Sequence, residues 1–168
     1  VLRAENVSVT ICYTETEIPA TLTKLKNLII ASDTLESYAV QLAKYKNDTG
    51  ISSRVVNTTW VYQHYGGIDR QEQIRNCIKD FVATYGIVYV TIFGDADQVP
   101  VRNAYVPDGQ DTYTPTDLYY ADLDGTWDDN KDGLYADQRY DNVDGIPDVY
   151  VGRIPPSLAQ NAQVAVDK

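Results

Sequence analysis

The feature that most constrains the fold is a series of short apolar runs separated by amphipathic stretches. The runs are LIIAS at 28–32, SSRVVNTT at 52–59 and IVYVTIFG at 87–94. Apolar residues at helical spacing lie between them, over 35–50 and about 69–85. Parallel strands need a crossover between them, and burial on both faces makes such strands almost wholly apolar. The pattern therefore predicts a mainly parallel sheet in a three-layer α/β/α arrangement.

The second half of the chain has a different texture. After Gly94 the sequence consists of loops rich in Asp, Gly, Pro and Tyr, interrupted by PTDLYYADL and by PDVYVGRIP, which predicts another buried strand. The final stretch, SLAQNAQVAVDK, has helical spacing and no stop signal. Residues 5–13 predict a strand, and we interpret residues 1–27 as the end of a preceding region. The α/β domain is expected to occupy 28–168 and to be truncated before its completion.

Composition excludes several classes of protein. The 168 residues, 43% of them apolar, are enough for one domain with a proper core. The net charge of −10 and the lack of a Lys or Arg cluster argue against a nucleic-acid partner. No apolar run approaches the length of a membrane span.

The two cysteines, Cys12 and Cys77, lie far apart in sequence, and we interpret both as free thiols. Cys77 shares one predicted helical face with Ile74, Ile78 and Phe81. A buried cysteine without a basic neighbour stays protonated. Cys77 is therefore expected to be a small core residue rather than a nucleophile.

Six blocks in order carry a resemblance to a known family. They are LIIAS, the helix with LAKYK and Gly50, IRNCIKDF, the strand ending in GDADQVP, TDLYYADLDG, and PDVYVGRIP with its following helix. From about Leu28 to Lys168 this order resembles the first part of the gingipain-type cysteine peptidases, family C25. The resemblance implies a caspase-like, flavodoxin-like α/β fold with two adjoining subdomains. It also implies a Cys–His dyad that cleaves peptide bonds.

The family's dyad has no counterpart in this sequence. In that family the catalytic His and Cys follow the segments that correspond to PDVYVGRIP and SLAQNAQVAVDK, so both would lie beyond Lys168. His64 precedes the Gly-Asp strand, and because a general base needs a nucleophile within reach, we interpret it as a surface or loop residue. The chain alone is expected not to hydrolyse peptides. Its expected partners are a protein or peptide substrate and the remainder of the catalytic domain.

Two aspartates are candidates for substrate binding. Function in open parallel sheets collects at the carboxyl ends of the strands, where Gly94-Asp95 and Gly152-Arg153 are expected. Asp95 has the alternative roles of capping a turn or pairing with Arg153. In arginine-cleaving members an aspartate in a setting similar to Asp117 lies at the floor of the substrate pocket, so the resemblance implies a two-point ion pair with a guanidinium there. A packing role for Asp117 remains open.

The acidic stretch from Asp122 to Asp148 holds nine aspartates and no glutamates, against only Lys131 and Arg139. Part of it reads D-x-N-x-D-G, which is the start of a calcium loop with oxygen ligands at alternate positions. The twelfth position is Arg139 rather than Glu, so the motif is not an EF-hand. We predict a structural Ca²⁺ site, with a solvated loop as the alternative. The candidate ligands are Asp128, Asn130, Asp132, the carbonyl of Leu134, and Asp137.

Two functions follow from these features. The first is the N-terminal portion of a secreted or surface cysteine endopeptidase, which supplies scaffold and part of the substrate cleft. The alternative is a calcium-stabilised, non-catalytic binding or adhesion module on a peptidase-like scaffold. Low-affinity calcium sites and the N-x-S/T sequons at Asn6, Asn47 and Asn57 favour a location outside the cell.

Overall fold

The structure, a computed structural model, describes residues 24–107, 112–156 and 158–167. The predicted strand at 5–13, Cys12 and the Asn6 sequon lie outside these residues. The elements, in chain order, are β1 (Asn27–Ala31), a 3₁₀ turn (Asp33–Leu35), α1 (Glu36–Asp48), β2 (Ser53–Asn57), α2 (Thr58–His64), α3 (Arg70–Tyr85), β3 (Tyr89–Phe93), β4 (Arg102–Tyr105), β5 (Tyr113–Thr116), α4 (Leu118–Ala121), β6 (Tyr150–Ile154) and α5 (Ala159–Val166). Across the described ranges, no helix has both the length and the apolar composition to cross a membrane.

The described residues form a parallel sheet with the strand order β2-β1-β3-β6. Tyr150 pairs with Tyr89 in its register, so the prediction that PDVYVGRIP joins this sheet is confirmed. One detail of the prediction is wrong. Gly152 and Arg153 pair with Thr91 and Ile92 inside β6, rather than following the end of the strand.

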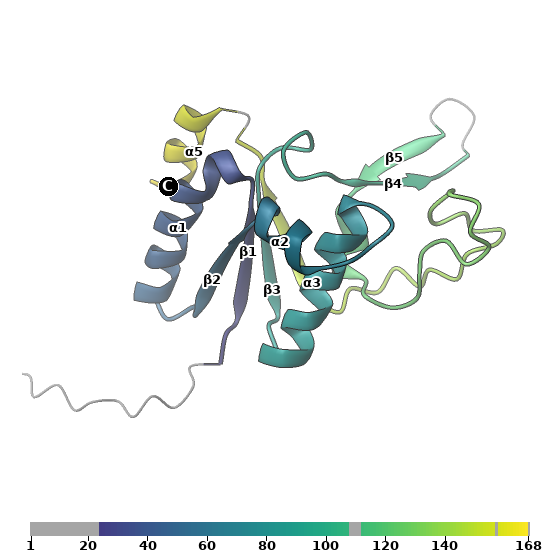
Figure 1. The fold of residues 1–168 in the computed structure, drawn as a ribbon, viewed down its shortest axis with the longest axis horizontal. Coiled ribbons are helices and arrows are strands. Elements are labelled where there is room, and N and C mark those ends of the chain that lie inside the picture. Colours follow the sequence, from purple (N-terminus) through teal and green to yellow (C-terminus); the bar gives the residue numbers. More distant parts are fainter. Residues whose placement is uncertain (1–23, 108–111, 157, 168) are drawn as a thin grey trace, which may run out of the picture.

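Helices cover both faces of the sheet (Figure 1). Helices α1 and α5 lie on one face, and α2 and α3 lie on the other. Because side chains alternate along a strand, Ile29 and Ala31 of β1 face α1, while Leu28 and Ile30 face α3. The predicted three-layer α/β/α fold with a mainly parallel sheet is therefore confirmed.

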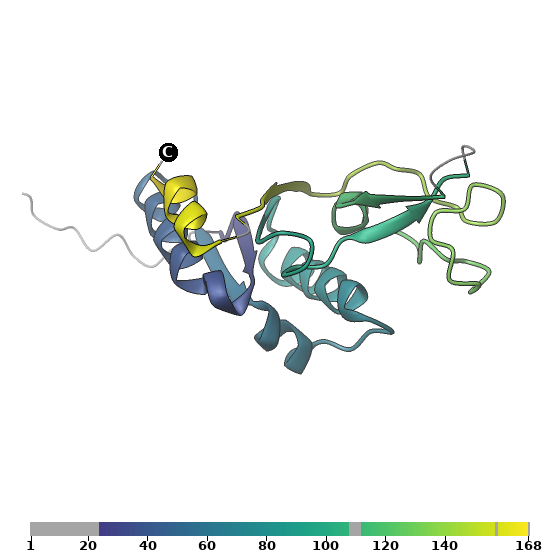
Figure 2. The ribbon, with the colours of Figure 1, turned by 90° about the horizontal axis from the view of Figure 1, so that it is seen from above.

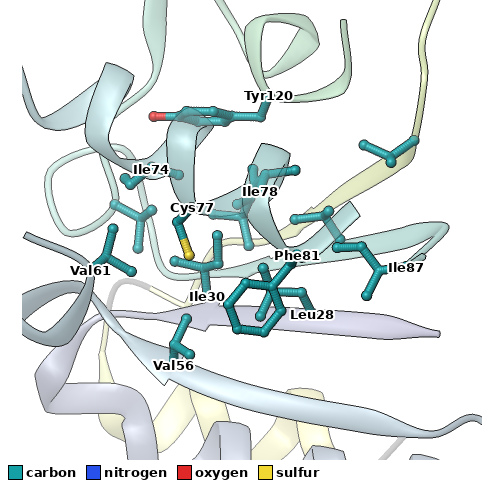
Figure 3. Close-up of a cluster of buried hydrophobic side chains, with 14 of the residues drawn as sticks. Leu28, Ile30, Val56, Val61, Ile74, Cys77, Ile78, Phe81, Ile87 and Tyr120 are labelled. Atoms are coloured by element: carbon teal, nitrogen blue, oxygen red, sulfur yellow. The ribbon is translucent and has the colours of Figure 1, made fainter. Parts of the chain in front are cut away.

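The larger core lies between the sheet and α3 (Figure 3). Leu28 and Ile30 of β1 pack there against Ile74, Cys77 and Ile78 of α3, and all five side chains are fully buried. Burial of this face contributes most of the stabilisation of α3, at about 25 cal/mol per Å² of apolar surface. The prediction that Cys77 is a core residue is confirmed.

The ends of α3 follow from its sequence. The Asp69 carboxylate accepts a hydrogen bond from the Glu72 amide (2.8 Å), which caps the first turn. At the other end Gly86 takes a left-handed φ of 64° and its amide donates to the Val82 carbonyl (2.9 Å).

The carboxylate that follows β1 does not cap the next helix. The Asp33 side chain makes no cap bond to α1 and instead accepts hydrogen bonds from the hydroxyls of Thr58 and Thr59 (3.1 and 2.9 Å). A carboxylate at this strand end is therefore used to join β1 to the start of α2.

A two-stranded hairpin and the long acidic loop project together from one side of the sheet body (Figure 2). The hairpin, β4–β5, is antiparallel and pairs Asn103 with Pro115; the sequence analysis assigned this region to loops. All of β5 except its last residue, Thr116, is exposed, so the hairpin lacks the alternating apolar pattern that predicts a strand.

Candidate functional site

Three neighbouring strands end at one level of the sheet. Ala31, Phe93 and Ile154 lie in register, and the Gly94 amide donates to the Ile154 carbonyl (2.9 Å). The Ser32 amide likewise donates to the Phe93 carbonyl (3.2 Å). The segments that follow β1 and β3 are thus joined to their neighbours at the carboxyl edge, where ligand sites form in open α/β sheets.

Asp95 lies in the turn that follows β3. Its carboxylate accepts a hydrogen bond from the Ala96 amide (2.7 Å), and its carbonyl accepts from Gln98 and Val99. The proposed pairing with Arg153 is wrong, because that guanidinium lies against another carboxylate. The contacts of Asp95 match the alternative role of forming a turn. A substrate role for Asp95 stays a prediction.

Asp117, just before α4, binds Arg153 of β6 through both carboxylate oxygens. The Arg153 Nε donates to Oδ2 (2.7 Å) and Nη2 donates to Oδ1 (2.6 Å). The remaining nitrogen, Nη1, donates to the carbonyls of Gly94 (2.8 Å) and Val99 (2.9 Å). A carboxylate expected to meet a substrate guanidinium thus meets one from its own chain. The substrate role of Asp117 stays a prediction.

A hollow of about 320 Å³ lies next to this pair. Asp117 is its one charged wall residue, and the other lining residues are Leu118, Ala121, Pro147, Val149, Tyr150 and Val151. The hollow is therefore mainly apolar and runs along the first half of β6.

The acidic loop is organised by its own backbone. The carboxylate of Asp128 accepts from the amides of Asp132 (3.0 Å) and Gly133 (3.1 Å), and the Asn130 side chain also accepts from Asp132 (3.2 Å). Asp132 in turn accepts from the Leu134 amide (2.8 Å). Three of the four side chains expected to bind calcium therefore lie close together and accept hydrogen bonds from amide groups.

Asp137, the fourth expected side chain, is paired with a charged partner. Arg139 donates to both of its oxygens (2.9 and 2.6 Å), and this interaction lowers the pKa of Asp137 against the effect of desolvation. Among the residues that the structure describes, no group of three or more His, Cys, Asp or Glu side chains is arranged to hold a metal ion. The calcium site stays a prediction: Asp128, Asn130 and Asp132 lie close together, whereas Asp137 is paired with Arg139.

Arg75 of α3 fixes the start of the acidic loop, and the sequence analysis missed it. Its guanidinium donates to the carbonyls of Asp122 (2.7 and 3.1 Å), Asp124 (2.5 Å) and Gly125 (3.1 Å). The Asp122 carboxylate lies 3.9 Å away, and both side chains are almost completely buried. Burial lowers the pKa of Arg75, and Tyr119 and Asp122 oppose that effect. The sequence signal that could have indicated this role is the position of Arg75 beside the apolar face of the predicted helix.

A second buried arginine joins α3 to the hairpin. Arg102 of β4 lies between the rings of Tyr119 (4.3 Å) and Tyr135 (3.8 Å) and donates to both oxygens of Asp69 (2.7 and 2.9 Å). Burial raises the pKa of Asp69, but the hydrogen bonds from Arg102 and the backbone outweigh it, so the net shift is downward. The cap of α3 is therefore also the anchor of β4.

His64 and Cys77 do not form a catalytic pair. His64 is exposed, stacks on Trp60 and bonds the Trp60 carbonyl through Nδ1 (2.8 Å). Cys77 is completely buried, and desolvation raises the pKa of its thiol to about 12. A thiol in that state is neither accessible nor ionised at neutral pH. The interpretation of both residues as non-catalytic agrees with this geometry.

Comparison with known proteins gives one family and a consistent fold. The model of peptidase family C25 matches residues 20–168. An uncharacterized protein of Archaeoglobus fulgidus is 28% identical over 158 residues, and the match covers 85% of this chain and 34% of that protein. The chain thus spans about a third of this curated relative's length.

Solved structures share the architecture. The Arg-specific cysteine proteinase gingipain R is 16% identical with a TM-score of 0.61, over 86% of this chain and 28% of that chain. Dimeric latent PorU from Porphyromonas gingivalis is 22% identical with a TM-score of 0.59, over 84% and 15% of the two chains. At these identities the likeness shows the fold alone.

Proposed function

The chain belongs to peptidase family C25, and we propose that it is the N-terminal portion of the catalytic domain of a cysteine endopeptidase. Its α/β scaffold is that of a cysteine peptidase, with the caspase-like fold of the gingipain structures. In this proposal the Cys–His dyad comes from polypeptide outside the present sequence, and the substrate is a protein or peptide. The dyad's imidazole would take the proton of the thiol, the thiolate would attack the scissile carbonyl, and the imidazolium would protonate the amine that leaves.

The family match over most of the chain is the observation that carries the proposal. Two features of the site support it. The carboxyl ends of β1, β3 and β6 form one level edge, and an apolar hollow beside Asp117 runs along the first half of β6. Of the His and Cys side chains within the described ranges, His64 is exposed but hydrogen-bonds a backbone carbonyl, and Cys77 is buried. These features fit a scaffold that positions reactive groups contributed from elsewhere.

Expression of the longer polypeptide from the same gene tests this function. We expect it to hydrolyse denatured casein and to lose activity after treatment with iodoacetamide, whereas the 168-residue chain shows no hydrolysis. Replacement of the proposed nucleophilic cysteine by alanine is the matched control. A longer polypeptide that folds, yet cleaves neither casein nor a mixed peptide library, would contradict the proposal.

A calcium-stabilised, non-catalytic binding or adhesion module is the second candidate, and the projecting acidic loop and exposed hairpin favour it. The same polypeptide separates the two functions, because the module predicts no His and Cys at successive strand ends after residue 168.

We also propose a location outside the cell, with limited support from the sequons. The Nδ2 of Asn57 donates to Glu36 (2.9 Å), and that of Asn47 donates to the Ser53 carbonyl (3.3 Å). Glycosylation at either position would break a hydrogen bond of the fold. The proposal therefore rests on the acidic loop and the family rather than on these two sequons.

Calcium binding by the acidic loop remains a proposal. Its support is the D-x-N-x-D-G spacing and the closeness of Asp128, Asn130 and Asp132, whose oxygens would exchange amide hydrogen bonds for the ion. A resident ion would raise the melting temperature, and a chelator would lower it. An Asp128→Asn, Asp132→Asn variant should show no response to added calcium. Identical melting temperatures with calcium and with chelator in the unaltered chain would remove the proposal.

A further inference from the structure

We propose that Arg153 and Asp117 form an internal clamp that positions the turn after β3, and that this clamp makes Asp117 unavailable to a basic side chain of a substrate. Arg153 is a positioning residue in this proposal. Its consequence for substrate selection rests on the proposed peptidase function, whereas the clamp itself does not.

The guanidinium joins three separate segments. It donates two hydrogen bonds to Asp117 at the start of α4 and two to the carbonyls of Gly94 and Val99, which bound the turn after β3. Arg153 itself lies inside β6, where its backbone is in register with Ile92. One side chain therefore sets the distance between β6, the turn and α4.

The Asp117–Arg153 pair is sheltered from solvent, which opposes the exchange of Arg153 for a guanidinium from a substrate. The exposed fractions of the two side chains are 13% for Arg153 and 24% for Asp117. Both carboxylate oxygens already accept a charge-assisted bond, and this side-on bidentate pair leaves no equivalent position for a second guanidinium. A substrate arginine would have to displace Arg153, whose backbone is fixed in the sheet and whose charge would then lie unpaired.

The hollow beside this pair is apolar and offers no free charge to a basic side chain. Its lining is mainly apolar, and the charge of Asp117, its one ionic residue, is neutralised by Arg153. A neutral apolar side chain can enter such a hollow without losing hydrogen bonds to water, while an ammonium or guanidinium would be desolvated without a free partner. The hollow should accordingly select against Lys and Arg.

Chemical rescue of the 168-residue chain tests the clamp. Arg153→Ala should raise the unfolding equilibrium constant about 100-fold or more, since it leaves a sheltered carboxylate unpaired. Ethylguanidinium should restore part of that loss in Arg153→Ala but none in an Asp117→Asn, Arg153→Ala double variant. An unfolding constant within twofold of the unaltered chain for Arg153→Ala would overturn the clamp.

A second measurement does not depend on whether the variants fold. N-acetyl-arginine amide is titrated into the unaltered chain, and the backbone NMR signals of Asp117 and Leu118 are followed. The clamp predicts no saturable shift. A saturable shift at these signals, together with release of the Arg153 Nε–H signal, would show that Asp117 receives an external guanidinium and would overturn the proposal.

In an active longer polypeptide, Asp117→Asn should change kcat/KM by the same factor for peptides with Arg, Lys or Leu at the cleavage position. A rise in KM confined to the Arg and Lys peptides would overturn the selectivity claim. A polypeptide with no activity on any peptide would refute the proposed function instead, while the rescue and titration experiments still decide the clamp.

Discussion

Replacement of Arg75 by methionine should loosen the acidic loop more than any change within the loop itself. Methionine keeps the aliphatic volume and the helix propensity of the position but removes every donor. The carbonyls of Asp122, Asp124 and Gly125 then lose their partner, and the buried Asp122 carboxylate loses its nearest cation.

The expected loss follows from these contacts. Each buried acceptor left without a donor costs about 1–3 kcal/mol, and removing one member of a buried ion pair costs about 3–5 kcal/mol. The terms overlap because one guanidinium serves all of them, and the loop can admit water. We therefore expect a loss of about 4 kcal/mol in the free energy of unfolding, a large part of the stability of a domain of this size.

Urea unfolding followed by circular dichroism measures the loss, and hydrogen exchange locates it. Arg70→Met is the matched control, because Arg70 lies exposed on the same helix over the ring of Tyr62 (5.2 Å) and should cost less than about 1 kcal/mol. Exchange should increase over residues 122–135 in Arg75→Met and not in the control. A loss below about 1 kcal/mol for Arg75→Met would refute the assignment of Arg75 as the loop anchor.

Three further predictions concern α3. The pKa of Asp69 lies below its ordinary value of 3.8 in the fold, so the stabilisation from its charge is present above that pH and is lost as the pH falls through the lower, folded value. Asp69→Asn should therefore be less stable than the unaltered chain at pH 7 and closer to it at pH 2, as urea midpoints would reveal; an equal gap at both pH values would contradict this. In a Cys12→Ser background, Cys77 should react with Ellman's reagent at pH 8 only after urea unfolding, because burial holds the pKa of its thiol at about 12, and rapid reaction of the folded chain would refute its burial. Gly86→Ala should cost about 1 kcal/mol because of the left-handed φ of 64°, and Gly86→Asn should cost less; thermal unfolding that ranks the two in the opposite order would count against this.

The sheet could be predicted because its strands carry a strong pattern. LIIAS and IVYVTIFG are almost wholly apolar, which is what burial on both faces requires, and the helical face around Cys77 has clear spacing. The hairpin could not be found this way. Nearly all of β5 faces solvent and it contains a proline, so its strand conformation is imposed by pairing with β4 rather than by its own composition.

The site was predicted less well, because side-chain partners depend on the tertiary arrangement. Asp117 and Arg153 are 36 residues apart, and only the sheet and α4 bring them together. Arg75 and Asp122 are 47 residues apart and likewise carry no local signal. The resemblance suggested an external guanidinium for Asp117, and a spacing argument could not show that the fold already contains one.

Pro115 protects the exposed outer edge of the projecting hairpin against pairing with a strand from another molecule. The Val106 amide donates to the Thr112 carbonyl across the hairpin. By register, the backbone groups of Tyr113 and Pro115 therefore point away from β4, along the outer edge of β5. Proline has no amide hydrogen, and this edge therefore cannot offer a full ladder to a strand from another molecule. Pro115 therefore weakens the pairing of this exposed ribbon with a strand from another molecule.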